Sequence, residues 1–216
     1  MLKVRGKAMK INPVVVDLSH HNEHVDFYAL QKAGVIGVIH KATQGTTFVD
    51  KEYAPRRGLA KSAGLLWGAY HFCTGEDPQK QYDYFKAAAQ PGPNTLVAID
   101  FEPNTTPGGT TMTLDQLHQL AAIVENDLGR KPVIYGGNHL KTVLNGAKDP
   151  VLSQHRLWWA QYGPAAQIPP AWSQYWLWQF TDGVHGPPPN TMPGIGPCDI
   201  DDFDGSDDDL KAQWAA

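Results

Sequence analysis

The sequence predicts an α/β protein whose chain folds as a TIM-like barrel of eight strands with about five helices. Two observations carry this prediction. Strand and helix patterns alternate through the first two thirds of the 216 residues, as in strand–helix units with a parallel sheet. The final third keeps three short apolar strands but joins them with segments rich in Pro and Gly. Five strand–helix units followed by three strands indicate a barrel of the (β/α)5(β)3 type, only partly covered by helices.

The five predicted units consist of short apolar runs that end at polar turns, each followed by apolar residues at helical spacing. Their strands are expected at residues 11–20, 35–43, 65–72, 95–102 and 131–136. Their helices are expected at residues 25–33, 53–63, 77–90, 113–128 and 138–144. The fourth helix has the clearest pattern, because Thr113 and Gln116 form a capping box ahead of a leucine-rich stripe.

The final third contains the last three strands of the predicted barrel. They are expected at residues 156–162, 176–180 and 198–203. Residues 183–197, GVHGPPPNTMPGIGP, are predicted to form a surface loop, because Pro and Gly dominate them. We divide the chain into an N-terminal extension (residues 1–12), one barrel domain (13–205) and a C-terminal tail (206–216) expected to dock on the barrel.

Composition and charge argue against several classes of protein. The net charge of −4 argues against a broad nucleic-acid-binding surface. No apolar run approaches the length that spans a membrane, so no membrane insertion is expected. The basic start of the chain has no apolar segment behind it, so no Sec signal peptide is expected. Two cysteines do not make a disulfide framework, and Cys73 and Cys198 are expected to be free thiols.

The stretch TLVAIDFE, residues 95–102, contains the candidate catalytic acids. Its buried strand ends in Asp100 and Glu102, which alternate with Phe101 and therefore project to the same side, roughly 6–7 Å apart at Cα. Burial and the neighbouring like charge should keep a proton on one of them near neutrality. One protonated acid beside one carboxylate is what cleavage of a glycosidic bond requires. The structural alternative is that these acids cap a loop or bind a lysine.

Two further acids are expected at the same end of the barrel. Asp17 ends the first strand, so it should lie at the carboxyl-terminal rim where barrel active sites are found. Asp199 begins the last strand and reaches this rim only if that strand runs antiparallel to the others. Either residue alone could be a turn or cap residue. Four acids converging on one mouth indicate a functional site.

Eight short motifs occur in order between about residues 13 and 205: VVVDLSHHN, KATQGTTFVD, GLLWGAYHF, LVAIDFE, PVIYGG, WWAQYG, WQFTDG and CDIDDFDG. Together they resemble the glycoside hydrolase family 25 lysozymes, the Chalaropsis-type N-acetylmuramidases. The resemblance implies a (β/α)5(β)3 barrel, with residues 13–205 as its catalytic domain. It also implies hydrolysis, with net retention, of the β-1,4 bond between N-acetylmuramic acid and N-acetylglucosamine in peptidoglycan.

Carried over by position, the resemblance makes Glu102 the proton donor, with Asp100, Asp17 and Asp199 around it. Asp100 would either stabilise the oxocarbenium-like state or orient the 2-acetamido group of the substrate as an internal nucleophile, and we favour the second role. Asp17 and Asp199 would set the charge of Asp100 and bind the sugar. The division of roles between these two acids stays open.

Four more positions match residues that face the groove in the family. Tyr70, Tyr135, Lys41 and Gln161 are expected to contact substrate. For the two tyrosines, packing inside the barrel is an equal alternative. The KATQG motif departs from the family, which usually has a glutamate where this chain has Gln44.

The alternatives are other enzymes and a binding module. A family 18-type chitinase would need an Asp at position 98, where this chain has Ala98. A catalytically inactive peptidoglycan-binding barrel would not need to retain both Asp100 and Glu102. A metal-dependent deacetylase or amidase would need converging ligands. The adjacent His20 and His21 would point to opposite sides of an extended chain, so neither a metal nor another cofactor is expected.

The context expected for such a chain is that of a phage or prophage endolysin. Without a Sec signal, it would stay in the host cytoplasm until release through a holin, or leave by another export route. Its partner would be the glycan strands of the cell wall. We expect it to act as a monomer.

Overall fold

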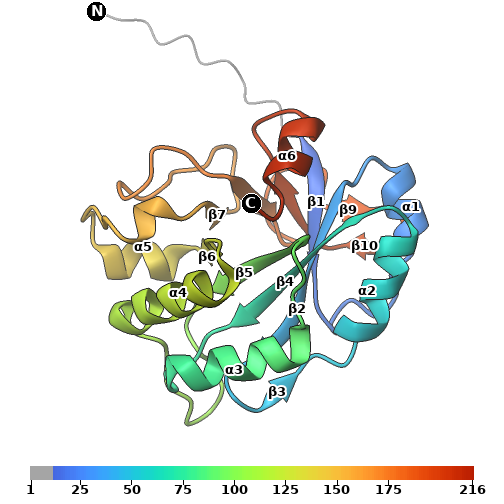
Figure 1. Ribbon diagram of the computed structural model, residues 1–216. Helices are drawn as coiled ribbons and strands as arrows, with labels where there is room; N and C mark the ends of the chain where they lie inside the picture. The colour runs from blue at the N-terminus through green and yellow to red at the C-terminus, as the bar shows by residue number, and fades with distance from the viewer. Residues whose placement is uncertain (1–11) are drawn as a thin grey trace, which may run out of the picture.

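The structure is a computed structural model that describes residues 12–216, and it shows eight strands closed into a barrel with helices around it (Figure 1). In order around the ring these strands are β1 (Pro13–Leu18), β11 (Asp199–Asp202), β8 (Leu177–Thr181), β7 (Leu157–Ala160), β6 (Val133–Gly136), β5 (Thr95–Asp100), β4 (Leu66–Phe72) and β2 (Gly37–Gln44). Pairing of β1 with β2 closes the ring. The predicted fold class is therefore confirmed.

The described residues form six α-helices, one more than expected. They are α1 (Phe27–Lys32), α2 (Tyr53–Ser62), α3 (Pro78–Ala89), α4 (Leu114–Leu128), α5 (Asn138–Leu144) and α6 (Asp207–Gln213). The predicted capping box of α4 is present, since Thr113 Oγ1 accepts from Gln116 N at 3.2 Å and Gln116 Oε1 accepts from Thr113 N at 2.9 Å. A 3-10 turn, η1 (Leu152–Gln154), precedes β7.

The direction of β11 is the feature that completes the rim. This strand pairs antiparallel with both β1 and β8, whereas the other neighbours in the ring pair parallel. The start of β11 therefore lies level with the carboxyl ends of the other strands, and Asp199 pairs with Asp17. The predicted antiparallel last strand is confirmed.

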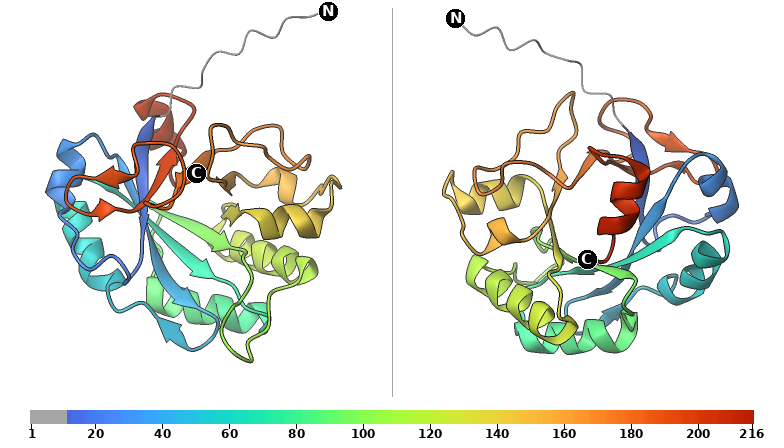
Figure 2. Two further views of the ribbon diagram at one scale, coloured as in Figure 1. Left: turned by 180° about the vertical axis from the view of Figure 1, so that it is seen from behind. Right: turned by 45° about the horizontal axis from the view of Figure 1, so that its top comes forward.

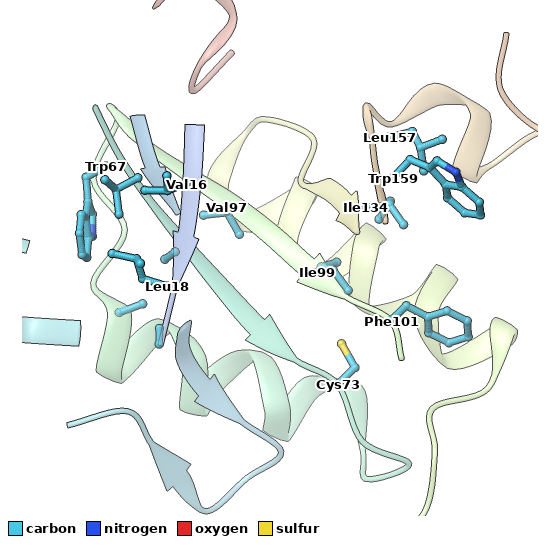
Figure 3. Close-up of a cluster of buried hydrophobic side chains, with 14 of the residues drawn as sticks. Val16, Leu18, Trp67, Cys73, Val97, Ile99, Phe101, Ile134, Leu157 and Trp159 are labelled. Atoms are coloured by element: carbon cyan, nitrogen blue, oxygen red, sulfur yellow. The ribbon is translucent and has the colours of Figure 1, made fainter. Parts of the chain in front are cut away.

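Side chains alternate between two apolar layers along each strand. One layer lies between the strands and the helices and includes Val97, Ile99, Phe101 and Trp159 (Figure 3). The other layer fills the interior of the barrel, and it includes Leu96 and Trp158 together with the following residues: Val15, Ile39, Ala98, Val133 and Leu177. The barrel is thus a packed core, with its polar side chains gathered at one end.

The structure corrects several boundaries. The β5 strand ends at Asp100, so Glu102 lies after the strand and not within it. The hydrogen-bond ladder with β6 continues for one more residue, because Phe101 N donates to Tyr135 O at 3.0 Å. A short strand, β3 (Phe48–Val49), pairs with β2 outside the ring. The segment expected to be a plain loop contains a small ladder, β9 (Thr191–Met192) with β10 (Gly196–Pro197). The N-terminal extension lies, apart from Asn12, outside the described residues.

The C-terminal segment closes the end of the barrel opposite the acids. Figure 2, in its right view, shows α6 (red) lying over the opening of the ring. Trp214, which is 2% exposed, joins the apolar interior and donates from Nε1 to Trp67 O at 3.0 Å. Gly37 makes room for this ring, since a Cβ there would lie 2.4 Å from Trp214 Cη2. Within residues 12–216, no helix is both long and apolar enough to cross a bilayer.

We expect Gly37→Ala to lower the free energy of unfolding by about 1–3 kcal/mol, because the rigid indole of Trp214 has to move. Urea unfolding followed by tryptophan fluorescence measures the change. Gly58→Ala is the matched control, since a Cβ at this position in α2 meets nothing within 4 Å and should be neutral or stabilising. Equal stability of the two variants would contradict the close contact.

Candidate active site

Four carboxyl groups meet at the carboxyl-terminal rim of the barrel. Asp17 is the last residue but one of β1, Asp100 ends β5, Glu102 follows two residues later, and Asp199 opens β11. Asp17 and Asp100 are buried, whereas Glu102 and Asp199 are half-buried. The four groups are close enough for their charges to act on one another: Asp199 and Asp100 on Asp17, and Glu102 on both Asp100 and Asp199. The structure thus brings all four predicted acids together.

This environment opposes the simultaneous ionisation of the four acids. Burial and the charge of Glu102 hold the pKa of Asp100 well above its usual range, with the Lys41 ammonium opposing the shift. Burial likewise raises the pKa of Glu102, again opposed by Lys41. Burial and the charges of Asp182 and Glu102 raise the pKa of Asp199 to about 7. The site can therefore hold protons at neutral pH, as a general acid requires.

Lys41, on β2, is the cation whose charge reaches both acids of the pair. Its Nζ donates to Gln44 Oε1 at 2.7 Å and lies 4.8 Å from the ring centroid of Phe72. Burial lowers the pKa of Lys41, partly offset by the charge of Asp100. Because its hydrogen-bond acceptor Gln44 is neutral, the positive charge of Lys41 acts on Asp100 and Glu102.

A hydrogen-bonded network joins Asp17 to two tyrosines through a residue that the sequence analysis missed. Gln179 on β8 donates from Nε2 to Asp17 Oδ2 at 2.7 Å. Its Oε1 accepts from the hydroxyl groups of Tyr135 at 2.9 Å and Tyr162 at 3.1 Å. A possible signal was the polar Gln179 inside the apolar run WLWQF, at an inward-facing position of a barrel strand.

Asp201 is a fifth acid that the sequence analysis also missed. It is fully buried on β11, two residues after Asp199, and its Oδ1 accepts from Trp158 Nε1 at 2.5 Å. Its Oδ2 has no hydrogen-bond partner among the described residues. Burial, together with the charge of Asp199, holds the pKa of Asp201 well above its usual range. Its spacing from Asp199 in CDIDDFDG places both on one strand face and could have revealed it.

Two cavities open at this rim. One, of about 340 Å³, is lined by Glu102 and by residues after β6 and β7, among them Lys141 and Tyr162. The other, of about 440 Å³, is lined by the loops after β2, β4 and β5, including Gln44 and Phe48. A larger cavity of about 600 Å³ lies beside Arg156 and Trp172, near the starts of β7 and β8, at the other end of the barrel. Of the four acids, Glu102 lines one of the two rim cavities, and the 600 Å³ cavity is lined by none of them.

The sequence of the barrel also matches a known family. A model of the family described as Glycosyl hydrolases family 25 matches residues 16–187. The chain belongs to this family. The matched range contains Asp17, Asp100 and Glu102, whereas Asp199 lies beyond it.

Individual proteins also resemble the chain over most of its length. Lysozyme M1 of Streptomyces globisporus is 26% identical over 180 residues, and the match covers 77% of this chain and 60% of that protein. A family GH25 lysozyme from Aspergillus fumigatus superposes with a TM-score of 0.77 at 27% identity, covering 93% of this chain and 98% of the other. The CTP1L endolysin structure superposes with a TM-score of 0.71 at 28% identity, covering 92% and 68% of the two chains.

The other predicted contact residues of this family 25 barrel occupy different environments. Tyr70 is half-buried inside the barrel, 6.3 Å from Trp158 between ring centroids, and Tyr135 is buried within the Gln179 network. Gln161 lines the cavity beside Glu102. Its Oε1, however, accepts from Trp159 Nε1 at 3.0 Å and from Gln167 N at 2.6 Å, so this oxygen holds the following loop in place.

The histidines after β1 differ from expectation in one respect. The rings of His20 and His21 lie 4.0 Å apart between centroids rather than on opposite sides, because they occupy a turn and not an extended strand. His20 Nδ1 contacts Asp50 Oδ2 at 2.9 Å. Over residues 12–216, no three His, Cys, Asp or Glu side chains are grouped so that they could hold a metal ion. Both cysteines are buried free thiols, as predicted.

Proposed function

We propose that this protein is a lysozyme that hydrolyses the β-1,4 bond between N-acetylmuramic acid and N-acetylglucosamine in peptidoglycan, with net retention. The observation that carries the proposal is the pair Asp100 and Glu102, two acids of raised pKa on one side of the chain at an open rim. Membership of family 25 and the similarity to proteins named lysozyme support it.

In this reaction Glu102 acts first as an acid and then as a base. Its raised pKa keeps a proton available for the glycosidic oxygen as the bond to C1 breaks. The resulting carboxylate then takes a proton from the water that attacks C1, which restores the acid. The half-buried position of Glu102 at a cavity of about 340 Å³ leaves room for both the leaving sugar and the water.

Asp100 serves as the residue that orients the substrate. It is buried more deeply than Glu102, and its Oδ1 has no hydrogen-bond partner among the described residues. We propose that this oxygen accepts from the N–H of the 2-acetamido group, whose carbonyl oxygen attacks C1 and forms an oxazolinium ion. Water then opens this ion from the other face, so two inversions give retention. Asp17 and Asp199 complete the acid cluster around Asp100.

Lys41→Met should move both limbs of the pH–rate profile to higher pH by about one unit. Lys41 stabilises the ionised forms of Asp100 and Glu102, so its removal raises the pKa of each. The acid form of Glu102 then persists to higher pH, while the carboxylate of Asp100 is lost sooner as pH falls. Initial rates on labelled peptidoglycan between pH 4 and 9, with the exposed Lys61→Met as control, check this. A pH–rate profile with both limbs unchanged would show that Lys41 does not lower the pKa of Asp100 or of Glu102.

We further propose that the protein works as a monomeric endolysin, released to the wall through a holin or another export route. The similarity to the CTP1L endolysin supports this context. Its substrate would be the glycan strands of peptidoglycan. Analytical ultracentrifugation of the full chain tests the monomeric state.

The experiment that tests the function is digestion of purified peptidoglycan, followed by borohydride reduction and mass spectrometry of the products. Reduced muramitol ends would establish a muramidase. Reduced glucosaminitol ends would instead show a glucosaminidase, and release of stem peptides an amidase. Cleavage of chitin oligomers but not of peptidoglycan would favour the chitinase-like alternative. Binding to several walls without any product would favour the inactive barrel.

A further inference from the structure

Gln179 connects three parts of the site that lie far apart in the sequence. Its side chain is 2% exposed and reaches from β8 to Asp17 on β1, to Tyr135 on β6 and to Tyr162 after β7. Tyr162 is 42% exposed and lines the same cavity as Glu102. A hydrogen-bonded path therefore runs from the substrate-facing surface to a buried acid of the cluster.

The chemistry of the partners determines which end of the amide faces Asp17. Two phenol hydroxyls converge on one atom of Gln179, and a hydroxyl directed at a single shared atom donates to it most simply when that atom is the carbonyl oxygen. Burial raises the pKa of Tyr135 and of Tyr162, so both keep their protons. The amide nitrogen then faces Asp17 and directs an N–H at its Oδ2.

We propose that Gln179 is a positioning residue that holds Asp17 as a hydrogen-bond acceptor, with its own amide oriented by Tyr135 and Tyr162. This role adds to the proposed function, because it keeps Asp17 as a hydrogen-bond acceptor before the substrate binds. In the reverse orientation Asp17 would have to donate a proton to Oε1, and both tyrosines would have to accept from the amide. The two arrangements predict opposite consequences when Gln179 is replaced.

Asp17 needs such a donor because its surroundings oppose its ionisation. The titratable groups that face it come from β11 and its start (Asp199, Asp201 and Cys198), β5 (Asp100), β4 (Tyr70), β6 (Tyr135) and the segment after β7 (Tyr162). Burial and the charges of Asp199, Asp201 and Asp100 raise the pKa of Asp17, and the hydrogen bond from Gln179 lowers it. Gln179 therefore counteracts the repulsion that the acid cluster creates.

The test uses Gln179→Met, which keeps length and removes both the donor and the acceptor without adding charge. The titration of the Asp17 carboxyl is followed by ¹³C NMR in the full chain without substrate, with Asp17→Asn to assign the signal. We expect the midpoint to rise by about one pH unit, because the ionised form loses a donor. A midpoint that falls would show the reverse orientation, and an unchanged midpoint would show that Gln179 only fills space. Either result overturns the proposal.

Two further variants keep the test decisive. Tyr162→Phe removes one hydroxyl from an exposed ring and should move the Asp17 midpoint in the same direction by less than about half a unit, even if Gln179→Met folds poorly. Gln81→Met is the matched control, since Gln81 is a fully buried glutamine of α3 that bonds to His71 and Thr74 away from the acids. It should lower the melting temperature and leave the Asp17 titration unmoved. A shift in this control equal to that of Gln179→Met would contradict the assignment.

Kinetics then relate the role to catalysis. On peptidoglycan we expect Gln179→Met to lower kcat about 10-fold with less than about a 2-fold change in KM. The acidic limb should move up by about one pH unit, because activity in this proposal requires the ionised form of Asp17 as well as that of Asp100. This part rests on the proposed function, whereas the NMR titration does not. If wild type cleaves no glycan, the function fails and the titration still decides the role of Gln179. A fall in kcat with an unchanged acidic limb of the pH–rate profile would overturn the proposed role of Gln179.

Discussion

Glu102→Gln is expected to lower kcat/KM on peptidoglycan by about 10³-fold, with little change in KM. The amide keeps the shape of the side chain and its place at the rim but has no acidic proton for the leaving oxygen. The measurement is the rate of appearance of reduced muramitol ends at the pH optimum of wild type. Binding to insoluble peptidoglycan, measured by co-sedimentation, should be retained.

The matched control is Glu23→Gln, an exposed residue before α1 that should keep full activity. A second control uses substrates with a more acidic leaving group, which need less protonation and should regain part of the lost rate in Glu102→Gln. Retention of more than about a tenth of wild-type activity on natural peptidoglycan would mean that another group supplies the proton. Asp199, with its pKa of about 7, would then be the next candidate.

Asp100→Asn is expected to lower kcat by about 10²–10³-fold while leaving the fold as stable as wild type or more stable. The rate falls because the asparagine cannot orient and polarise the acetamido N–H through a charged oxygen. Stability is kept because the substitution removes one charge from a cluster in which Glu102 already repels it. Thermal unfolding and initial rates, measured on the same preparation, separate the two effects.

The role of Asp100 is decided by comparing two chemical probes. A thiazoline analogue of the oxazolinium ion should inhibit wild type competitively and bind Asp100→Asn at least about 10-fold more weakly. A 2-fluoro glycosyl donor, which lacks the acetamido group, should not label the protein, because the proposed route uses no nucleophile from the protein. Mass-spectrometric detection of a glycosyl ester on Asp100 would instead make this residue the nucleophile and exclude substrate assistance.

Much of the fold could be predicted because its signals are local. The Thr113–Gln116 capping box and the apolar stripe behind it lie within one helix, and α4 begins and ends as expected. The strands β3, β9 and β10 were missed because each is only two residues long. Two residues are too few to show the alternation of side chains that identifies a strand. Helix α6 is seven residues long, and its docking depends on Trp214 finding the interior of the barrel.

The candidate site, too, could be predicted from the sequence only in part. Asp100 and Glu102 could be paired from the sequence, because two residues of one extended chain share a side. Gln179 could not be assigned, since its contact with Asp17 spans 162 positions of the chain. Asp201 was missed although its spacing from Asp199 was visible, because the burial of Asp201 and of the neighbouring Asp202 depends on how β11 packs in the ring.

By itself, the sequence determined the order of the strands and helices, the family, and the acid pair that ends the fourth unit. The element order and the acid pair follow from periodicity and spacing, which act over a few residues, whereas the family follows from the resemblance carried by eight short motifs. Only the tertiary structure decided which acids meet, since the pairing of Asp17 with Asp199 requires β11 to run antiparallel between β8 and β1. It also decided the charge state that each acid favours. Burial and the fields of distant side chains set a pKa, and both depend on how the ring of strands closes.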